Sequence, residues 1–273
     1  MKKLAVLQSN YIPWKGYFDI IHDVDEFIFY DEVQFTKNDW RNRNKIFTPQ
    51  GEVWLTVPVG MNKIHRAIVD VQIKDSSWQR KHFKTLEMAY HKAPYWKRYE
   101  EFLASVYLEK TWTYLYELNR FLIEHIARDF LGITTKFTDS RDYPTHGVKH
   151  EKLLSLVKAA QADLYLSGPA AKDYIVAEDY AAAGIQLVWK DYSNYPAYLQ
   201  RGGGGVAASL LITFLSWICS LTLATTLRIT FGVGATIHNR QNLGTLFAYK
   251  KTRPEPVTGH AARLFLLPKI SSH

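Results

Sequence analysis

The sequence predicts an α/β protein: a Rossmann-like, mostly parallel sheet with a β-hairpin insertion and a central helical segment. Three observations predict this class. Short apolar runs near the N-terminus are joined by an amphipathic segment, residues 76–132 have helical spacing, and residues 134–192 return to apolar runs that alternate with helical patterns. Strands that alternate with helices form parallel sheets, in which ligands bind where the strand ends meet the loops.

The stretch 4–45 contains the first strand–helix–strand unit. The apolar run at residues 4–7 predicts a buried strand, and a polar loop over residues 8–15 follows it. Residues 16–24 have apolar side chains at helical spacing, and residues 27–30 predict a second buried strand. Because both strands end in polar and aromatic loops, we place the working part of the protein here.

Residues 45–74 predict β structure with turns at residues 49–51 and 60–62. Apolar and polar side chains alternate over residues 53–57 and again over residues 69–73, which indicates a hairpin beside the binding edge.

Three helices are predicted next, over residues 78–93, 95–108 and 113–131. Pro94 separates the first two, and Gly132 ends the third. The remaining elements are strands at 136–138, 164–166 and 186–189 and helices at 148–160 and 170–183.

Candidate binding residues gather in the loops after the first two strands. The first loop and the helix start offer an amide, aromatic rings and a glycine: Gln8, Tyr11, Trp14, Gly16 and Tyr17. The second loop offers a carboxylate, cations, amides and an indole: Asp31, Gln34, Lys37, Trp40, Arg41, Asn42 and Arg43. Its cations suit phosphates and its carboxylate suits a sugar hydroxyl. The alternative is a solvated loop whose tryptophans pack into the core.

A second group of candidates follows the strand at residues 164–166. Ser167 and Gly168 lie between a strand and a helix start, where backbone N–H groups can hold a phosphate or carboxylate. Tyr198 and Gln200 offer stacking and hydrogen bonding, although packing of an edge loop would explain them equally. No cysteines or histidines have metal-ligand spacing, so we expect no metal site.

The charge distribution argues against a nucleic-acid partner. The 273-residue chain has a formal net charge of +8, of which residues 206–273 carry +6. We therefore expect a small-molecule substrate and no nucleic acid. The single cysteine, Cys219, excludes an internal disulfide framework. The N-terminal apolar run is too short for a signal peptide, so we expect a cytoplasmic protein.

The order of the motifs resembles the WbqC-like family of bacterial proteins. The first match is Gln8-x-x-Tyr-x-Pro-Trp-x-Gly-Tyr-Phe, and the second is Asp31-x-Val-Gln-Phe-x-Lys-x-x-Trp-x-Asn-Arg-Asn. Further matches keep their order along the chain: Leu55-Thr-Val-Pro-Val, Tyr165-Leu-Ser-Gly168 with Tyr174, and Tyr195-Pro-x-Tyr198-x-Gln200. The chain departs from the family at Ser9, where proline is usual. The resemblance adds Tyr174 to the binding candidates.

The resemblance implies a cytoplasmic transferase of surface-polysaccharide (O-antigen) biosynthesis. Such an enzyme adds glycine or another acyl group to an amino sugar, which we expect to be nucleotide-linked. In this hypothesis Asp31 and Lys37 are the candidate catalytic residues, with Asp31 as the base or as the acceptor for a sugar hydroxyl. Trp14 or Trp40 stacks on a base or sugar, and the phosphates are held by Arg41, Arg43 and Lys37.

Two alternatives stay open. The strand–loop–helix–strand order also resembles adenylating nucleotidyltransferases, which would use Mg-ATP, but their His-x-Gly-His motif is replaced here by Trp14-Lys15-Gly16-Tyr17. The many tryptophans and tyrosines also fit a non-catalytic nucleotide-sugar or carbohydrate-binding protein.

The character of the chain changes at the glycines of residues 202–205, so we predict a single domain over residues 1–200 and an aberrant tail over residues 201–273. Residues 206–227 are 22 residues without a charge, long enough to span a bilayer. The family instead continues with Ser-x-Leu-Asp-Leu-Leu-Phe-Asn. Because the last base of the Trp217 codon and the first two bases of the Ile218 codon read GAT, a frame shifted by one nucleotide gives that aspartate.

We therefore predict a one-nucleotide frameshift near residues 202–205 and expect no membrane span from the tail. With permitted codon choices, residues 216–232 read in the shifted frame as LDLLFNFGNNAKNYFR. Sequencing the DNA of this region checks the prediction, and a shifted frame that does not encode LDLLFN would contradict it.

Overall fold

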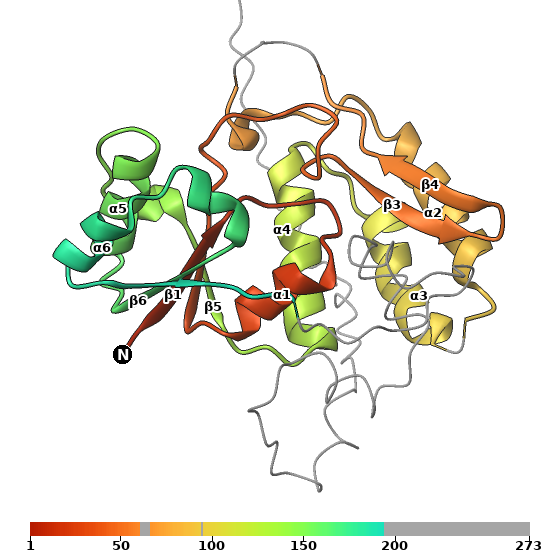
Figure 1. Ribbon diagram of the computed structural model, residues 1–273. Helices are drawn as coiled ribbons and strands as arrows, with labels where there is room; N and C mark the ends of the chain where they lie inside the picture. The colour runs from red at the N-terminus through yellow and green to blue at the C-terminus, as the bar shows by residue number, and fades with distance from the viewer. Residues whose placement is uncertain (61–65, 94, 194–273) are drawn as a thin grey trace, which may run out of the picture. The chain divides into compact units, whose positions relative to one another are not determined.

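The computed structural model describes residues 1–60, 66–93 and 95–193 (Figure 1). All of them belong to the first of two compact units, Met1–Gly234, and the second unit, Ala235–His273, lies outside the described residues. The predicted tail, the apolar stretch at 206–227, Tyr198 and Gln200 also lie outside them. Within the described residues, no helix has the length and apolar character needed to cross a membrane.

The described residues form one parallel five-stranded sheet. Its order is β5-β2-β1-β6-β7, and every neighbouring pair is parallel. The strand bounds are β1 Lys3–Leu7, β2 Glu26–Phe29, β5 Lys136–Asp139, β6 Leu164–Ser167 and β7 Gln186–Trp189. The chain builds outwards from β1 to β2 and β5, then returns to the other side of β1 for β6 and β7. This confirms the predicted Rossmann-like, mostly parallel sheet.

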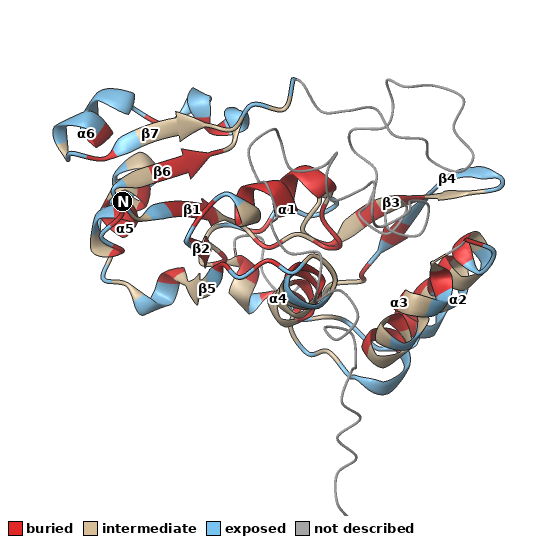
Figure 2. Ribbon diagram, turned by 90° about the horizontal axis from the view of Figure 1, so that it is seen from below, coloured by how far each residue is buried: buried red, intermediate tan, exposed pale blue. Residues whose placement is uncertain are grey.

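Helices cover both faces of the sheet. Helices α1 (Lys15–His22) and α4 (Leu115–His125) pack on one face, and α5 (His150–Ala159) and α6 (Ala177–Ala182) pack on the other (Figure 1). Along β1 the side chains alternate between the two hydrophobic clusters, with Ala5 in the first and Leu4 and Val6 in the second. Burial on both faces explains why the strands read as continuous apolar runs. Buried residues accordingly concentrate in β1, β6 and α1 (Figure 2).

The predicted hairpin exists, but its strands differ from those expected. Strand β3 (Arg43–Thr48) pairs antiparallel with β4 (Gly51–Thr56) through the predicted turn at residues 49–51, where Gly51 has φ +114°. The alternating segment at residues 69–73 is not a strand of this hairpin, although Gln72 and Ile73 form isolated antiparallel bridges with Tyr114 and Val59. Its start lies in a 3₁₀ turn, η1 (Ile68–Asp70), because the Ile68 and Val69 N–H groups donate to carbonyls of the loop after β2 (3.0 and 2.9 Å).

The central helical segment is confirmed. Helices α2 (Ser77–Tyr90) and α3 (Trp96–Ala104) precede α4. Helices α3 and α4 each continue into a π-helical turn, η2 (Ser105–Glu109) and η3 (Ile126–Phe130). Gly132 follows with φ +66°, as expected of a glycine that ends a helix.

The segment after β6 contradicts one expectation. Residues 170–183 do not form a continuous helix: a 3₁₀ turn, η5 (Pro169–Asp173), is separated from α6 by extended backbone at Val176. The cause is a tertiary contact, because the Val176 N–H donates to His150 Nδ1 (3.3 Å) on α5 instead of continuing the helix. A further 3₁₀ turn, η4 (Ser140–Asp142), follows β5.

Candidate functional site at the carboxyl edge of the sheet

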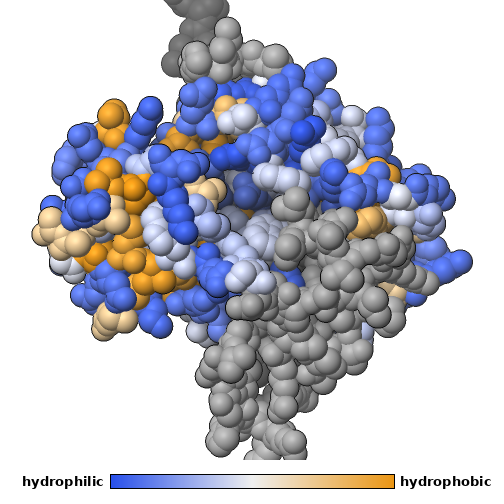
Figure 3. All heavy atoms as spheres, viewed as in Figure 1, coloured by the Kyte–Doolittle hydropathy of each residue, from blue (hydrophilic) through white to orange (hydrophobic). Residues whose placement is uncertain are grey.

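The carboxyl ends of the parallel strands bring several predicted residues to one edge. Gln8 follows β1, Asp31 lies two residues after β2, and Ser167 ends β6. The strand order reverses between β1 and β6, and ligands of open α/β sheets bind at such a point. On the face drawn in Figure 3, hydrophilic atoms line a recess where Figure 1 shows the end of β1 beside α4.

Asp31 lies at the centre of this edge and is fully buried. One of its carboxylate oxygens accepts the Ser9 N–H (2.7 Å), and the other accepts Nε–H of Arg120 (2.8 Å) from helix α4. The same guanidinium donates through Nη1 to Asp139, the last residue of β5. Arg120 therefore links the ends of two neighbouring strands.

The pKa values of Asp31 and Arg120 are both raised, but for different reasons. Burial raises the pKa of Asp31, against the opposing effects of Arg120 and the Ser9 N–H. Burial alone would lower the pKa of Arg120, but the carboxylates of Asp31 and Asp139 outweigh it and raise that pKa. We take the group as ionised, with one guanidinium held between two carboxylates.

A second guanidinium, that of Arg41, reaches the same edge from the loop before β3. Its Nη atoms donate to the Gln8 side chain and to Asp39. The Tyr17 hydroxyl donates to the Gln8 backbone carbonyl (2.9 Å), and the pKa of Tyr17 is raised by burial and by the charge of Asp31. The structure thus brings together Gln8, Tyr17, Asp31 and Arg41, all of which the sequence predicted as site residues.

Both guanidiniums retain buried N–H groups without a hydrogen-bond partner in the described part of the chain. These are Nε of Arg41 and Nη2 of Arg120. A buried unpaired donor costs about 1–3 kcal/mol, more for a charged group, so such donors call for an explanation. An anionic ligand that accepts from both arginines would satisfy them.

Sequence reasoning missed the contribution of helix α4. Asn119 is fully buried and donates to the Arg41 carbonyl (2.9 Å), so it fixes the loop that carries Arg41. Arg120, beside it, holds Asp31. One feature of the sequence could have revealed both residues. Asn119 and Arg120 are polar and lie between Leu118 and Leu122 of a helix whose other buried residues are apolar.

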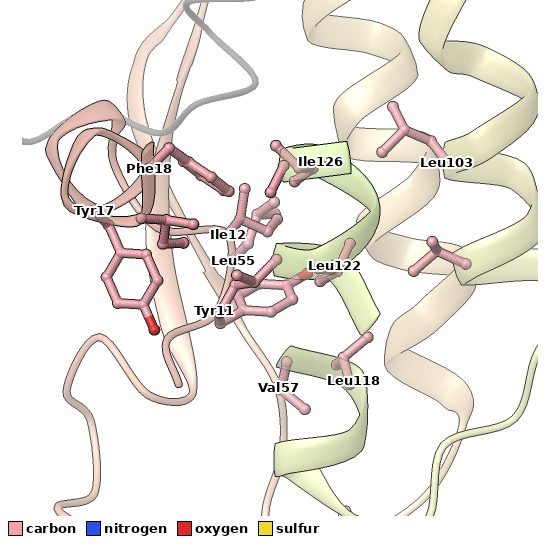
Figure 4. Close-up of a cluster of buried hydrophobic side chains, with 14 of the residues drawn as sticks. Tyr11, Ile12, Tyr17, Phe18, Leu55, Val57, Leu103, Leu118, Leu122 and Ile126 are labelled. Atoms are coloured by element: carbon pink, nitrogen blue, oxygen red, sulfur yellow. The ribbon is translucent and has the colours of Figure 1, made fainter. Parts of the chain in front are cut away.

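Tyr11 lies in the core and away from any open surface. It is 0% exposed and packs near Val57, Leu118 and Leu122 (Figure 4). Its hydroxyl hydrogen-bonds to Tyr107 (2.6 Å) and to Nδ1 of His82 (2.8 Å). Burial lowers the pKa of His82 to about 4, so this histidine is neutral at pH 7 and accepts from Tyr11.

Trp14 and Gly16 contact each other at the start of α1. A Cβ added to Gly16 would lie 2.3 Å from the Trp14 ring, and the ring centroids of Trp14 and Tyr192 are 4.9 Å apart. The indole thus covers Gly16 and packs against Tyr192.

The remaining candidates of the second loop are directed elsewhere. The Arg43 guanidinium lies over the exposed Trp54 ring (4.2 Å), which also contacts Trp40 (5.7 Å between centroids). Asn42 is buried and donates to the Val57 carbonyl (3.1 Å), so it joins the loop to the end of the hairpin. Two candidates are exposed, Gln34 and Lys37.

Asn44 holds the first loop in a strained conformation. Ile12 has φ +47°, which is uncommon for a β-branched residue. The Asn44 amide donates to the carbonyls of Tyr11 (3.1 Å) and Ile12 (2.6 Å). Strain held in this way is typical of loops that must present a backbone to a ligand.

Ser167 and Gly168 lie on the α5/α6 side of the edge. Ser167 is buried, and a Cβ added to Gly168 would meet nothing within 4 Å. Tyr174, predicted from the family resemblance, is half-exposed near them. Among the described residues, no three His, Cys, Asp or Glu side chains group as metal ligands.

Comparisons with known proteins identify a family and a relative of this chain. The model described as "WbqC-like protein family" matches residues 8–211. The chain is 43% identical over 216 residues to the uncharacterized protein Rv1507c of Mycobacterium tuberculosis, an alignment that covers 79% of this chain and 93% of the relative. No solved structure matches the chain.

Proposed function

The chain belongs to the WbqC-like protein family, and from this premise we propose that it is a transferase acting on a nucleotide-linked amino sugar. The transferred group is glycine or another acyl group, and the setting is surface-polysaccharide biosynthesis in the cytoplasm. The observation that carries the proposal is the pair of arginines, Arg41 and Arg120, with unpaired buried donors at the strand-order reversal of a parallel sheet.

In this proposal the two guanidiniums hold the phosphates of the nucleotide sugar. Arg41 was expected in this role, whereas Arg120 takes the place foreseen for Arg43 and Lys37, because Arg43 lies over Trp54 and Lys37 is exposed. Bidentate contacts between guanidinium and phosphate are the strong, charge-assisted kind. The transfer itself forms an amide bond between the sugar nitrogen and the acyl carbon. It breaks the bond between that carbon and the leaving group of the activated donor, and the amine loses a proton to water.

Asp31 contributes by holding Arg120. Its carboxylate is fully buried and both oxygens accept hydrogen bonds, so it orients the guanidinium towards the ligand. This positioning role differs from the general base expected from the sequence, which would need direct access to the substrate.

Arginine substitutions test the phosphate-binding role. Arg41→Ala should weaken binding of UDP-N-acetylglucosamine, an analogue of the N-acylated product, about 10- to 100-fold, because a hydrogen bond to a charged group contributes about 1.5–3 kcal/mol. Arg43→Ala is the matched control, since its guanidinium contacts Trp54, and it should bind as the unmodified chain does. Isothermal titration calorimetry measures both; equal affinity in the two variants would contradict the assignment.

A ligand panel separates the transferase from its alternatives. We expect nucleotide amino sugars to raise the melting temperature, since saturating ligand at a hundredfold excess over Kd adds about 2.7 kcal/mol. Stabilisation by Mg-ATP instead, with pyrophosphate release in the presence of glycine, would favour an adenylating enzyme. Mass spectrometry detects any transfer of glycine or an acyl group from an activated donor. If a nucleotide sugar binds but no such transfer is detected, a binding protein is favoured.

A further inference from the structure

Four tyrosines gather on the α5/α6 side of the same sheet edge. Tyr30 follows β2, Tyr165 belongs to β6, Tyr174 follows η5, and Tyr180 belongs to α6. We call them the tyrosine cluster. The rings of Tyr165 and Tyr180 are stacked, with centroids 5.4 Å apart and an angle of 14° between the planes.

The hydroxyls of the tyrosine cluster lie close together and are neutral at pH 7. Burial raises the pKa of Tyr30 to about 12 and raises those of the other three as well. Tyr30 and Tyr174 both add to the pKa shifts of Tyr165 and Tyr180, as expected only of neighbouring groups. Neutral phenols both donate and accept hydrogen bonds.

One hydroxyl of the cluster has no partner. Tyr180 is 0% exposed, and within the described residues nothing hydrogen-bonds to its hydroxyl. A buried hydroxyl without a partner costs about 1–3 kcal/mol, which phenylalanine at this position would avoid. The presence of a hydroxyl at Tyr180 is therefore explained if a ligand forms a hydrogen bond with it.

The surroundings leave room for a ligand and disfavour an anion. Gly168 has open space where a side chain would begin, and Tyr174 is 52% exposed. Lys152 is paired with Glu32 (2.8 Å), and Nε2–H of His150, whose Nδ1 accepts the Val176 N–H, donates to Asp179 (2.8 Å). Because the lysine is already paired and Asp179 is a carboxylate, a ligand that exchanges hydrogen bonds fits such a site better than an anion.

We propose that the tyrosine cluster, with Ser167 and Gly168, binds the hydroxylated ring of a sugar. The phenol hydroxyls exchange hydrogen bonds with the sugar hydroxyls, and the half-exposed ring of Tyr174 packs on its C–H groups. This deepens the proposed function and rests on it: the sugar lies on the α5/α6 face of the sheet edge, and the phosphates lie on the α1/α4 face at Arg41 and Arg120. The site thus selects a ligand that joins a sugar ring to an anionic linkage.

Removal of single hydroxyls tests the sugar site. Tyr180→Phe should keep or raise the melting temperature, because it removes an unpaired buried hydroxyl, yet weaken binding of UDP-N-acetylglucosamine about tenfold. Its affinity for UDP should not change. Tyr174→Phe should lower the affinity in the same ligand-specific way. Calorimetric titration of the full chain with both ligands gives these values.

Tyr143→Phe is the matched control. Its hydroxyl donates to Glu26, the first residue of β2, at the opposite end of the strand from Tyr30. This variant should lose stability while it binds UDP-N-acetylglucosamine normally. A structural role alone for the tyrosine cluster would give Tyr180→Phe the same pattern and would overturn the proposal.

The outcomes separate this inference from the proposed function. Equal affinity of the unmodified chain for UDP and UDP-N-acetylglucosamine would overturn the sugar site and leave the phosphate site standing. Binding of free N-acetylglucosamine that is lost in Tyr180→Phe, without binding of UDP, would support the sugar site and contradict the nucleotide-linked substrate. Absence of binding by the sugar in either form would overturn the sugar site.

Discussion

Replacement of Arg120 by alanine is expected to lower the free energy of unfolding by about 3–5 kcal/mol, the usual cost of removing one partner from a buried ion pair. The variant leaves Asp31 fully buried with a single hydrogen bond, from the Ser9 N–H, and removes the link to Asp139. Urea unfolding at pH 7 measures the loss. The result would identify Arg120 as the residue that joins α4 to the ends of β2 and β5.

The loss of stability in Arg120→Ala should increase as the pH rises. Burial already raises the pKa of Asp31, and without Arg120 that pKa rises further. A carboxyl group whose pKa is higher in the folded than in the unfolded state binds more protons when folded, so the variant loses stability as the pH rises from about 4. The free energy of unfolding of the variant should therefore be closest to that of the unmodified chain in mild acid.

Two further variants make the Arg120 prediction specific. Arg128→Ala removes an arginine that is half-exposed and 3.9 Å from Glu124, so it should cost less than about 1 kcal/mol. Combining Arg120→Ala with Asp31→Asn should recover part of the stability, because the unpaired buried charge is gone. A cost for Arg120→Ala no larger than that for Arg128→Ala would contradict the central role of the ion pair.

Glu26→Gln is expected to cost on the order of 2 kcal/mol at pH 7 and much less at pH 2. Glu26 is 2% exposed and binds Lys2 (2.7 Å), Thr138 (2.9 Å) and the Tyr143 hydroxyl. Burial alone would raise its pKa, but these hydrogen bonds lower it from 4.5 to about 2. A lowered carboxyl pKa stabilises the fold above about pH 4.5, and that stabilisation is lost as the pH falls towards 2.

Unfolding measured between pH 7 and pH 2 checks this prediction. The unmodified chain should lose more stability across the acid range than Glu26→Gln. Glu52→Gln is the matched control, because about a third of each side chain in its pair with Lys45 (2.7 Å) is exposed, and it should change stability by less than about 1 kcal/mol. Parallel pH profiles for the unmodified chain and Glu26→Gln would contradict the role assigned to this carboxylate.

Local sequence patterns determined most of the elements. The apolar runs at residues 4–7 and 27–30 became β1 and β2, and Gly132 ended a helical segment as expected. The errors fell where backbone groups bond to distant parts of the chain. Residues 68–70 bond to the loop after β2, and Val176 bonds to His150, contacts that no local periodicity encodes.

The candidate site was predicted in part for the same reason. Residues that follow strands, such as Gln8 and Asp31, could be placed at one edge because parallel strands end together. The positions of Arg43 and Tyr11 could not be predicted in this way. The hairpin directs Arg43 over Trp54, and Tyr11 is enclosed in the core.

The sequence by itself therefore determined the α/β class, the strand-end loops and the family, because periodicity and motif order are properties of neighbouring residues. Tertiary structure alone decided which charges meet. Arg120 lies 89 positions from Asp31 and yet binds it, and Tyr30 and Tyr180 come from opposite halves of the described chain. Such pairs form only when the sheet stacks its strands side by side and helices close over both faces, which brings together residues that are distant in sequence.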